Sequence, residues 1–269
     1  MTRLLSALVL IIIFALPVAF GPVWMFFLLT LIILPSCLYE LFTVSLEASA
    51  RPLGWIVTLG SIPLLWFIYT GSLVHVCCTL IIISLAVMVT GLFLFETNRS
   101  TARDTSAALS GIIYPMLLLG CWILLRMGTD GRFWLIFGLV CTFFSDGGAY
   151  YAGKNLGRHC LARRLSPNKT WEGLLGGGIT SMVAGTLSYY IYTNYVPLEI
   201  PVSVWTIVAL APVITLLGLT GDLSASMIKR EFKVKDMGNL IPGHGGMLDR
   251  MDGVIPVGAA LYIILRIIQ

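Results

Sequence analysis

Apolar runs long enough to cross a lipid bilayer recur along the whole of this 269-residue chain. A membrane-spanning helix needs roughly 20 consecutive, mainly apolar residues. Because lipid offers the backbone no hydrogen-bond partners, each run must satisfy its own backbone as a helix. We identify nine such runs, at residues 4–20, 23–40, 53–71, 73–95, 106–125, 132–150, 173–193, 203–221 and 252–268. The sequence therefore predicts an all-α fold, a polytopic integral membrane helical bundle of about nine transmembrane helices.

Polar residues divide the chain unevenly. Residues 1–140 are nearly all apolar with short connections, whereas residues 141–269 also contain two long polar segments. We expect one membrane domain over residues 1–269, with transmembrane helices in the first part and site-forming helices and cytoplasmic loops in the second. Glu40 and Glu47, in the first part, are interpreted as interfacial charges that fix the topology.

Lysine and arginine are distributed unequally between the two ends of the predicted helices. With nine spans and the N-terminus inside, 14 of the 17 cationic residues fall on the cytoplasmic side, in agreement with the positive-inside rule. Both polar segments are then cytoplasmic and the C-terminus lies outside, and merging two early spans would move only the N-terminus. Arg3 before the first run is also compatible with a signal peptide, but no small-residue cleavage pattern follows, which favours a retained helix. Without a targeting extension, we expect a bacterial inner-membrane protein.

The polar segment at residues 221–252 concentrates charge in a chain of which only 11% is charged. A charge near the centre of a membrane helix costs roughly 2.5–3.5 kcal/mol, so such a concentration indicates a functional site. Asp222, Ser226, Lys229 and Lys233 recur at helical spacing and would form one stripe of a helix continuing out of the eighth span. A carboxylate at the membrane boundary followed by ammonium groups suits a metal-bound polyphosphate.

The end of this segment combines glycines with acids. The glycines within 242–246 permit a tight backbone that would turn N–H groups toward phosphate oxygens. Asp249 and Asp252 are three residues apart, so one helix would place both on the same face at the start of the last span. Carboxylate oxygens of this kind suit Mg²⁺, which uses one or two carboxylates together with substrate phosphates. The competing interpretation is a structural salt network in which these acids pair with nearby Lys and Arg.

The other polar segment, residues 145–177, begins with an acid at the end of the sixth span. Asp146 requires a cation or a metal there, because an unpaired carboxylate would be costly. The stretch 166–170 places short polar side chains and Lys169 at the entry to the seventh span, where free helix N–H groups suit an anion.

Two glycine patterns in the same segment have simpler interpretations. Residues 148–155 nearly spell a nucleotide-binding P-loop, but Asn155 replaces the metal-binding hydroxyl and an apolar span stands where a strand should precede, so we reject it. Gly173 and Gly177 form a G-x-x-x-G pair, which is typical of close helix packing, within a chain or at a dimer seam.

Motifs between residues 145 and 252 together form one long pattern. They comprise Asp146…Ala149-Tyr150…Gly153-Lys154…Gly157-Arg158, Ser166-Pro167-Asn168-Lys169-Thr170-Trp171-Glu172-Gly173, Ser226-x-Ile228-Lys229-Arg230, Lys235-Asp236-x-Gly238, and Ile241-Pro242-x-His244-Gly245-Gly246-Met247-x-Asp249-Arg250-Met251-Asp252. This pattern resembles the signature of phosphatidate cytidylyltransferases, the CDP-diacylglycerol synthases. The resemblance implies a membrane enzyme that makes CDP-diacylglycerol and pyrophosphate from CTP and phosphatidate with Mg²⁺, often as a dimer.

The resemblance and the residue chemistry together give the polar residues expected roles. Those expected to act catalytically are Asp222, Lys229, Arg230, Asp249 and Asp252. Those expected to hold Mg²⁺, with one or two ions both open, are Asp146, Asp222, Asp249 and Asp252. Those expected to bind substrate are Lys154, Ser166, Lys169, Thr170, Ser226, Lys235, Asp236, His244, Gly245, Gly246 and Arg250. The expected partners are CTP, phosphatidate, membrane lipid and a second copy of the chain, and no nucleic acid.

Two other functions share parts of this pattern. A CTP-dependent kinase of a long-chain alcohol would transfer the γ-phosphoryl group, but its hydroxyl nucleophile needs a base that the sequence does not obviously offer. A secondary transporter would hold its acids near the membrane midplane, in matched halves of the chain. The acids here are predicted to lie at one membrane face, so we expect nucleotidyl transfer.

Overall fold

The computed structural model describes residues 17–195, 202–241 and 245–268, and the chain divides into two compact units. The first unit comprises Met1–Leu124 and Glu231–Met251, and the second comprises Leu125–Arg230 and Asp252–Gln269. This division differs from the boundary expected near residue 140, because a late segment of the chain belongs to the first unit. That the units form one membrane domain stays a prediction.

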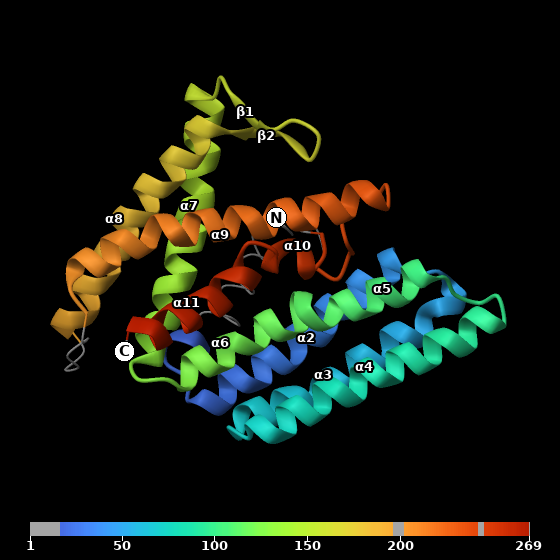
Figure 1. The fold of residues 1–269 in the computed structure, drawn as a ribbon. Coiled ribbons are helices and arrows are strands. Elements are labelled where there is room, and N and C mark those ends of the chain that lie inside the picture. Colours follow the sequence, from blue (N-terminus) through green and yellow to red (C-terminus); the bar gives the residue numbers. More distant parts are fainter. Residues whose placement is uncertain (1–16, 196–201, 242–244, 269) are drawn as a thin grey trace. The chain divides into compact units, whose positions relative to one another are not determined.

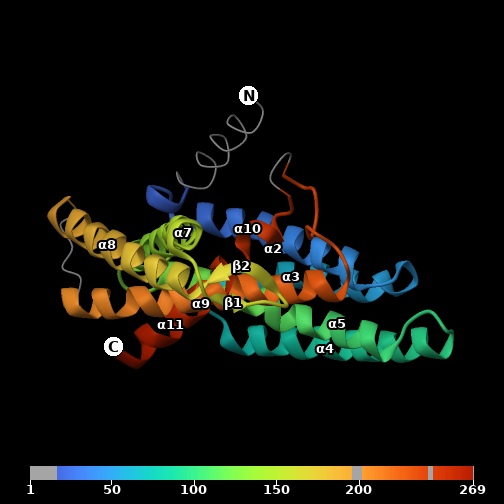
Figure 2. The same cartoon turned by 90° about the horizontal axis from the view of Figure 1, so that it is seen from above.

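Long antiparallel helices build the first unit. They are α2 (Val23–Ser45), α3 (Arg51–Tyr69) and α4 (Leu73–Glu96), followed by the consecutive elements α5 (Ala102–Gly111), η2 (Ile112–Leu117) and α6 (Leu118–Met127). The last residues of α6, after Leu124, belong to the second unit. The short 3₁₀ helix η1 (Ala48–Ala50) connects α2 to α3, and the short helix α10 (Leu248–Met251) packs on α2. Helices α3 and α4 lie side by side (Figure 1), and the view from above shows α5 beside α4 (Figure 2).

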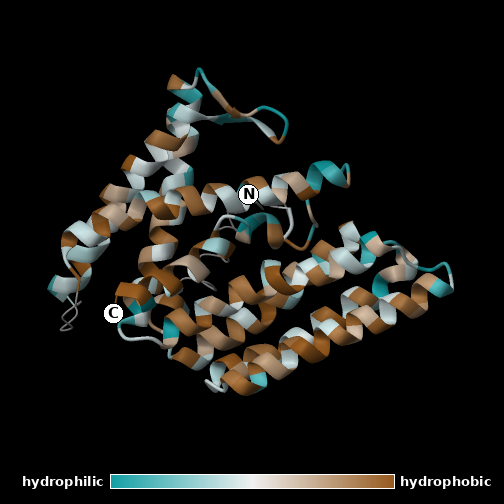
Figure 3. Ribbon diagram, viewed as in Figure 1, coloured by the Kyte–Doolittle hydropathy of each residue, from teal (hydrophilic) through white to brown (hydrophobic). Residues whose placement is uncertain are grey.

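The core of the first unit forms around α2. Leu34 and Leu38 are fully buried there, and the Phe42 ring fills the space left by two glycines on neighbouring helices. A Cβ atom added to Gly54 of α3 would lie 2.8 Å from a side-chain carbon of Phe42. A Cβ atom added to Gly111 of α5 would lie 2.4 Å from another carbon of the same side chain. These contacts exclude any larger side chain unless the ring moves. Most helices are coloured hydrophobic in Figure 3, as expected for a lipid environment.

The second unit is built from α7 (Gly131–Leu156), α8 (Trp171–Tyr195), α9 (Val204–Glu231, up to Arg230) and α11 (Val254–Ile268). Helices α7 and α8 pack closely through small residues (Figure 1). A Cβ atom at Gly173 would lie 2.9 Å from the carbonyl oxygen of Ala149, and one at Gly177 would lie 2.8 Å from that of Ser145. The G-x-x-x-G pair therefore makes the close helix packing that its spacing predicts, and makes it within one chain.

A two-stranded antiparallel hairpin connects α7 to α8. Strand β1 (Cys160–Ala162) pairs with β2 (Ser166–Thr170), with Cys160 opposite Thr170 and Ala162 opposite Ser166. The N–H of Leu165 donates to the carbonyl of Ala162 at 3.2 Å and closes the turn. The hairpin carries mostly hydrophilic colours in Figure 3, in contrast to the helices that flank it. The sequence predicted a polar loop here and not a hairpin.

The predicted fold class is confirmed, and the structure adds detail to the predicted spans. Among the described residues, six helices are long and apolar enough to cross a membrane. They are Val23–Ser45, Ala48–Tyr69, Leu73–Glu96, Ala102–Met127, Gly131–Leu156 and Val204–Glu231. Helix α11 covers the last predicted run but is shorter, and α8 covers the seventh run without reaching the same apolar character. The first predicted run, 4–20, lies almost wholly outside the described residues, and the count of nine stays a prediction.

Candidate active site

Three predicted site residues from three elements converge within the second unit. Asp146 belongs to α7, Lys169 to β2 and Asp222 to α9. The Lys169 ammonium nitrogen lies 2.5 Å from Asp222 Oδ2, and both residues are close enough to Asp146 to interact with it electrostatically. We call this group the Asp146–Asp222–Lys169 cluster. Its first and last residues in the sequence, Asp146 and Asp222, are 76 positions apart. The hairpin contributes to the convergence, because β2 carries Lys169 to its ion pair with Asp222.

Asp252 enters the same unit beside α9. Its carbonyl oxygen would lie only 2.1 Å from a Cβ atom at Gly221, so the chain passes α9 at Gly221 more closely than any larger residue there would allow. A Cβ atom at Gly253 would lie 3.9 Å from Asp146 Oδ2. The Asp252 carboxylate accepts a hydrogen bond from the N–H of Gly253 at 2.7 Å. Asp252, which was predicted as a metal ligand, therefore lies in the turn next to the Asp146–Asp222–Lys169 cluster.

The stripe predicted along α9 is correct over most of its length. Ser226 donates to Asp222 Oδ1 at 3.4 Å, which places both on one helix face, and Lys229 lies within the same helix. The prediction was wrong for Lys233, because α9 ends at Glu231 and Lys233 adopts a left-handed backbone with φ of 56°. Lys233 therefore does not continue the row of cations above Asp222.

The prediction that Asp249 and Asp252 share one helical face was also wrong. Asp249 lies on α10, which ends at Met251, and a turn at Asp252 and Gly253 precedes α11. The interruption lies where the backbone at residue 252 passes close to Gly221 of α9. Asp249 belongs to the first unit and Asp252 to the second.

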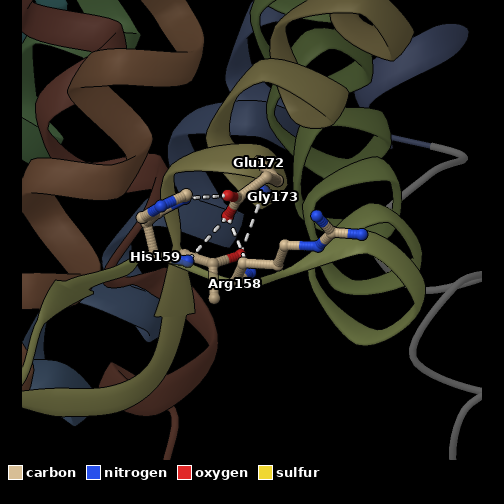
Figure 4. A network of polar contacts seen from close by, with 5 residues as sticks. Arg158, His159, Glu172 and Gly173 are labelled. Carbon is tan, nitrogen blue, oxygen red and sulfur yellow. Dashed lines mark hydrogen bonds and ion pairs between the residues drawn. The ribbon is translucent and has the colours of Figure 1, made fainter.

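A second polar network fixes the base of the hairpin (Figure 4). The Glu172 carboxylate, at the start of α8, accepts hydrogen bonds from the N–H groups of Arg158 at 3.1 Å and His159 at 3.2 Å. It also contacts His159 Nδ1 at 2.5 Å. The His159 hydrogen bond, reinforced by the backbone donors, lowers the pKa of Glu172 from 4.5 to about 2. Glu172 is therefore ionised at neutral pH and ties the two ends of the hairpin together, a role that the sequence analysis did not assign.

The remaining predicted residues of the hairpin region have mainly local contacts. Arg230 Nε donates to the carbonyl of Leu165 at 3.3 Å, so this cation contacts the hairpin turn. Thr170 Oγ1 accepts from the N–H of Gly173 at 3.1 Å and caps the first turn of α8. Lys154 is exposed and lies over the ring of Tyr150, with its Nζ atom 5.9 Å from the centroid. Ser166 begins β2.

The motif residues of the first unit form a loop around two carboxylates. We call residues 235–250 the signature loop, of which the structure describes 235–241 and 245–250. Asp249 Oδ2 accepts from the N–H of Met237 at 2.8 Å and from the N–H of Gly246 at 3.1 Å. Gly245 has a positive φ of 81°, as its position in a tight turn requires. The N–H of Gly246 is thus directed at Asp249, whereas the sequence pattern predicted that these glycines would direct N–H groups at phosphate.

Other predicted members of the signature loop remain at its surface. Lys235, Asp236 and Arg250 are exposed. His244 lies outside the described residues, and its expected role stays a prediction.

Glu40 is the most important residue whose role was not predicted from the sequence. It lies inside α2, is only 2% exposed, and accepts hydrogen bonds from the N–H groups of Met247 at 3.0 Å and Leu248 at 2.9 Å. Its interpretation as an interfacial topology charge was wrong, because the side chain is buried against the signature loop. A signal was present, since Glu40 is an acid within an apolar run, and such acids are expected to have a functional or structural partner.

The clusters differ in what they offer a metal ion. Within the described residues of each unit, no three His, Cys, Asp or Glu side chains lie close enough together to bind a metal by themselves. The Asp146–Asp222–Lys169 cluster does provide two carboxylates, and Mg²⁺ is commonly bound by one or two carboxylates with water and substrate phosphates. The donor set therefore fits Mg²⁺ with a bound phosphate ligand.

The fold and these clusters define a helical membrane protein with acids and cations arranged for a phosphate-bearing ligand. Comparison with known families identifies it more closely: residues 1–268 match the Cytidylyltransferase family. The chain belongs to this family.

Curated relatives agree with the family assignment. The chain is 30% identical over 265 residues to a phosphatidate cytidylyltransferase of Staphylococcus aureus (strain COL), covering 98% of each chain. It is 33% identical over 226 residues to one of Brucella suis, covering 83% of this chain and 77% of the relative. It is 35% identical over 166 residues to one of Mycobacterium leprae, covering 62% of this chain and 51% of the relative.

Proposed function

We propose that this protein transfers CMP from CTP to phosphatidate, giving CDP-diacylglycerol and pyrophosphate. The observation that carries the proposal is the convergence of Asp146, Asp222 and Lys169, which are separate in the sequence, within one unit of a membrane protein of this family. The names of the relatives that align over nearly the whole chain support the same reaction.

The chemistry of the substrates explains why this residue set is sufficient. A phosphate monoester has a second pKa of about 6, so phosphatidate is largely dianionic at neutral pH and needs no general base. One of its oxygens attacks the α-phosphorus of CTP, a new P–O bond forms, and the bond to the bridging oxygen of the β-phosphate breaks. Pyrophosphate leaves with the electron pair. The protein must therefore align two anions and neutralise the charge that develops between them.

Each residue of the cluster has a role in that task. Lys169 would bind a phosphate oxygen when its ion pair with Asp222 is exchanged, and Lys229 would extend the positive potential along α9. We propose that Asp146 and Asp222 hold Mg²⁺ together with substrate phosphates and water; the expected roles of Asp249 and Asp252 as ligands stay predictions. Bound Mg²⁺ would stabilise negative charge on the phosphates. The exposed Lys235 and Arg250 would contact CTP phosphates or the phosphatidate headgroup.

We further propose that the site faces the cytoplasm of a bacterial inner membrane and that the enzyme functions as a dimer. The excess of Lys and Arg in the polar segments supports this orientation. A C-terminal alkaline phosphatase fusion should be active and a C-terminal GFP fusion should be dark, because the C-terminus is expected outside. The opposite result would refute the orientation. Crosslinking in native membranes tests the dimer, and a product of monomer mass alone would refute it.

Two labelled nucleotides test the reaction itself. Purified protein is incubated with Mg²⁺, phosphatidate and CTP carrying ³²P at either the α or the γ position. We expect α-label to enter the lipid phase and γ-label to appear in pyrophosphate. A lipid kinase, given a long-chain alcohol in place of phosphatidate, would instead put γ-label in the lipid and leave α-label in CDP. No labelled product in either incubation would refute both reactions.

A further inference from the structure

Two carboxylates of the first unit accept hydrogen bonds from four backbone N–H groups of the signature loop. Asp249, within the loop, accepts from Met237 and Gly246. Glu40, from a helix about 200 residues earlier in the sequence, accepts from Met247 through Oε1 and from Leu248 through Oε2. Three consecutive N–H groups, from residues 246 to 248, therefore all point at carboxylates.

The loop is also shaped to admit the Glu40 side chain. A Cβ atom at Gly238 would lie 2.4 Å from Glu40 Oε1, and a Cβ atom at Gly246 would lie 2.5 Å from Oε2. The two glycines thus leave the space that the carboxylate occupies. Any larger residue at either position must displace the carboxylate or the loop.

The burial of Glu40 makes these contacts necessary for the carboxylate as well as for the loop. A carboxylate with 2% exposure has almost no water to solvate it, so its charge must be compensated by protein donors. Hydrogen bonds to an ionised acceptor are stronger than those between neutral groups. The Glu40 side chain and the loop backbone therefore fix one another in a single arrangement.

We propose that Glu40 is a positioning residue for the nucleotidyl transfer reaction: it fixes the backbone of residues 246–248 and so orients the charged residues of the signature loop. The proposal rests on the proposed function, since those charged residues are the expected substrate and metal ligands. Glu40 itself touches neither substrate nor metal. It acts through Gly246, Met247 and Leu248, which lead directly into Asp249 and Arg250.

Glu40→Gln tests the proposal with the smallest change of shape. The amide keeps one acceptor oxygen but turns an NH₂ group toward the second backbone N–H, so one hydrogen bond is lost and two donors face each other. We expect kcat to fall on the order of 100-fold, because a misplaced positioning element costs about that much, while the KM for CTP changes much less. Glu47→Gln is the matched control, because Glu47 is exposed near the end of the same helix; it should keep full activity. Wild-type kcat in Glu40→Gln protein would overturn the proposal.

A double-mutant cycle separates positioning from a general loss of stability. Gly238→Ala introduces the Cβ atom that collides with Glu40, and Glu40→Asp withdraws the carboxylate by one methylene. We expect Gly238→Ala to reduce kcat less in the Glu40→Asp background than in the wild type, because residues in contact are not additive. Equal effects in both backgrounds would refute the contact. Activity assayed well below the unfolding temperature of each variant ensures that only folded protein is compared.

Amide hydrogen exchange tests the contact between Glu40 and the signature loop without depending on the enzymatic reaction. In the wild type, the amides of Met247 and Leu248 should exchange slowly because Glu40 accepts from both. They should lose protection in Glu40→Gln protein and keep it in Glu47→Gln protein. If the wild type proves inactive toward phosphatidate but this pattern is seen, the proposed function fails and the anchoring by Glu40 stands. Unchanged exchange in Glu40→Gln protein would overturn the anchoring itself.

Discussion

The ion pair between Lys169 and Asp222 allows a catalytic role to be distinguished from a stabilising one. The charged atoms lie 2.5 Å apart, and at an effective dielectric constant of about 20 their attraction is roughly 6–7 kcal/mol. However, 22% of the Lys169 side chain and 39% of the Asp222 side chain remain exposed, so screening and desolvation offset most of that energy. Partly exposed ion pairs contribute only about 0–1 kcal/mol to folding.

Lys169→Met should therefore affect the reaction far more than the fold. Loss of one preorganised positive group at the reacting phosphates costs about 3–4 kcal/mol of transition-state stabilisation, which is roughly 10²–10³-fold in kcat. Transfer of ³²P from α-labelled CTP to phosphatidate gives kcat, and thermal unfolding in detergent gives the stability. We expect the loss of rate together with a change of unfolding temperature of only a few degrees.

The control for this experiment is Arg99→Met, which removes the same charge from an exposed position at the end of α4. It should leave both activity and unfolding temperature unchanged. Lys169→Met protein that kept more than half of the wild-type kcat, or that lost activity only in proportion to the loss of folded protein, would refute the reasoning.

Three further variants test other parts of the structure. Asp222→Asn should abolish turnover while leaving the protein folded, and near-wild-type activity would contradict its proposed metal role. Lys229→Ala should lower kcat through lost transition-state stabilisation, and a rise in the KM for CTP alone would assign it to ground-state binding. Because the folded-state pKa of Glu172 is lowered to about 2, its contribution to stability is present above pH 4.5 and is lost as the pH falls toward 2. Glu172→Gln should therefore lose most stability relative to wild type above pH 5 and little near pH 2, measured by unfolding across that range; an equal difference at both ends would contradict the ion-pair account.

The helices were predictable because their signal is local. Runs of apolar residues identify α2 to α4 and α7 directly, and helical spacing placed Asp222 and Ser226 on one face of α9. The spacing rule failed at Lys233, because it assumes that the helix continues and no breaker marks its end at Glu231. It failed again between Asp249 and Asp252, because α10 ends at Met251 and a turn follows at residues 252–253, where the backbone passes close to Gly221.

Contacts between segments that are far apart in the sequence were harder to predict. The hairpin at residues 160–170 lacks an Asn-Gly or Asp-Gly turn, which is the strongest short-range hairpin signal, so it was taken for a loop. The convergence of Asp146 with Asp222 was expected from their common role as metal ligands, which the residue chemistry and the family resemblance gave, but the ion pair of Lys169 with Asp222 depends on that hairpin. Glu40 was misjudged because its donors lie 207 and 208 positions further along the chain.

The path of the chain between the two units limits how the gene can be divided. The polypeptide leaves the second unit after Arg230 and re-enters it at Asp252, and the intervening stretch completes the first unit. A fragment that ended at Leu124 would therefore contain Glu40 but not Met247 and Leu248, whose N–H groups donate hydrogen bonds to its carboxylate. Neither unit corresponds to one uninterrupted stretch of the gene, so a truncation at Leu124 or at Arg230 separates residues that belong to the same compact unit.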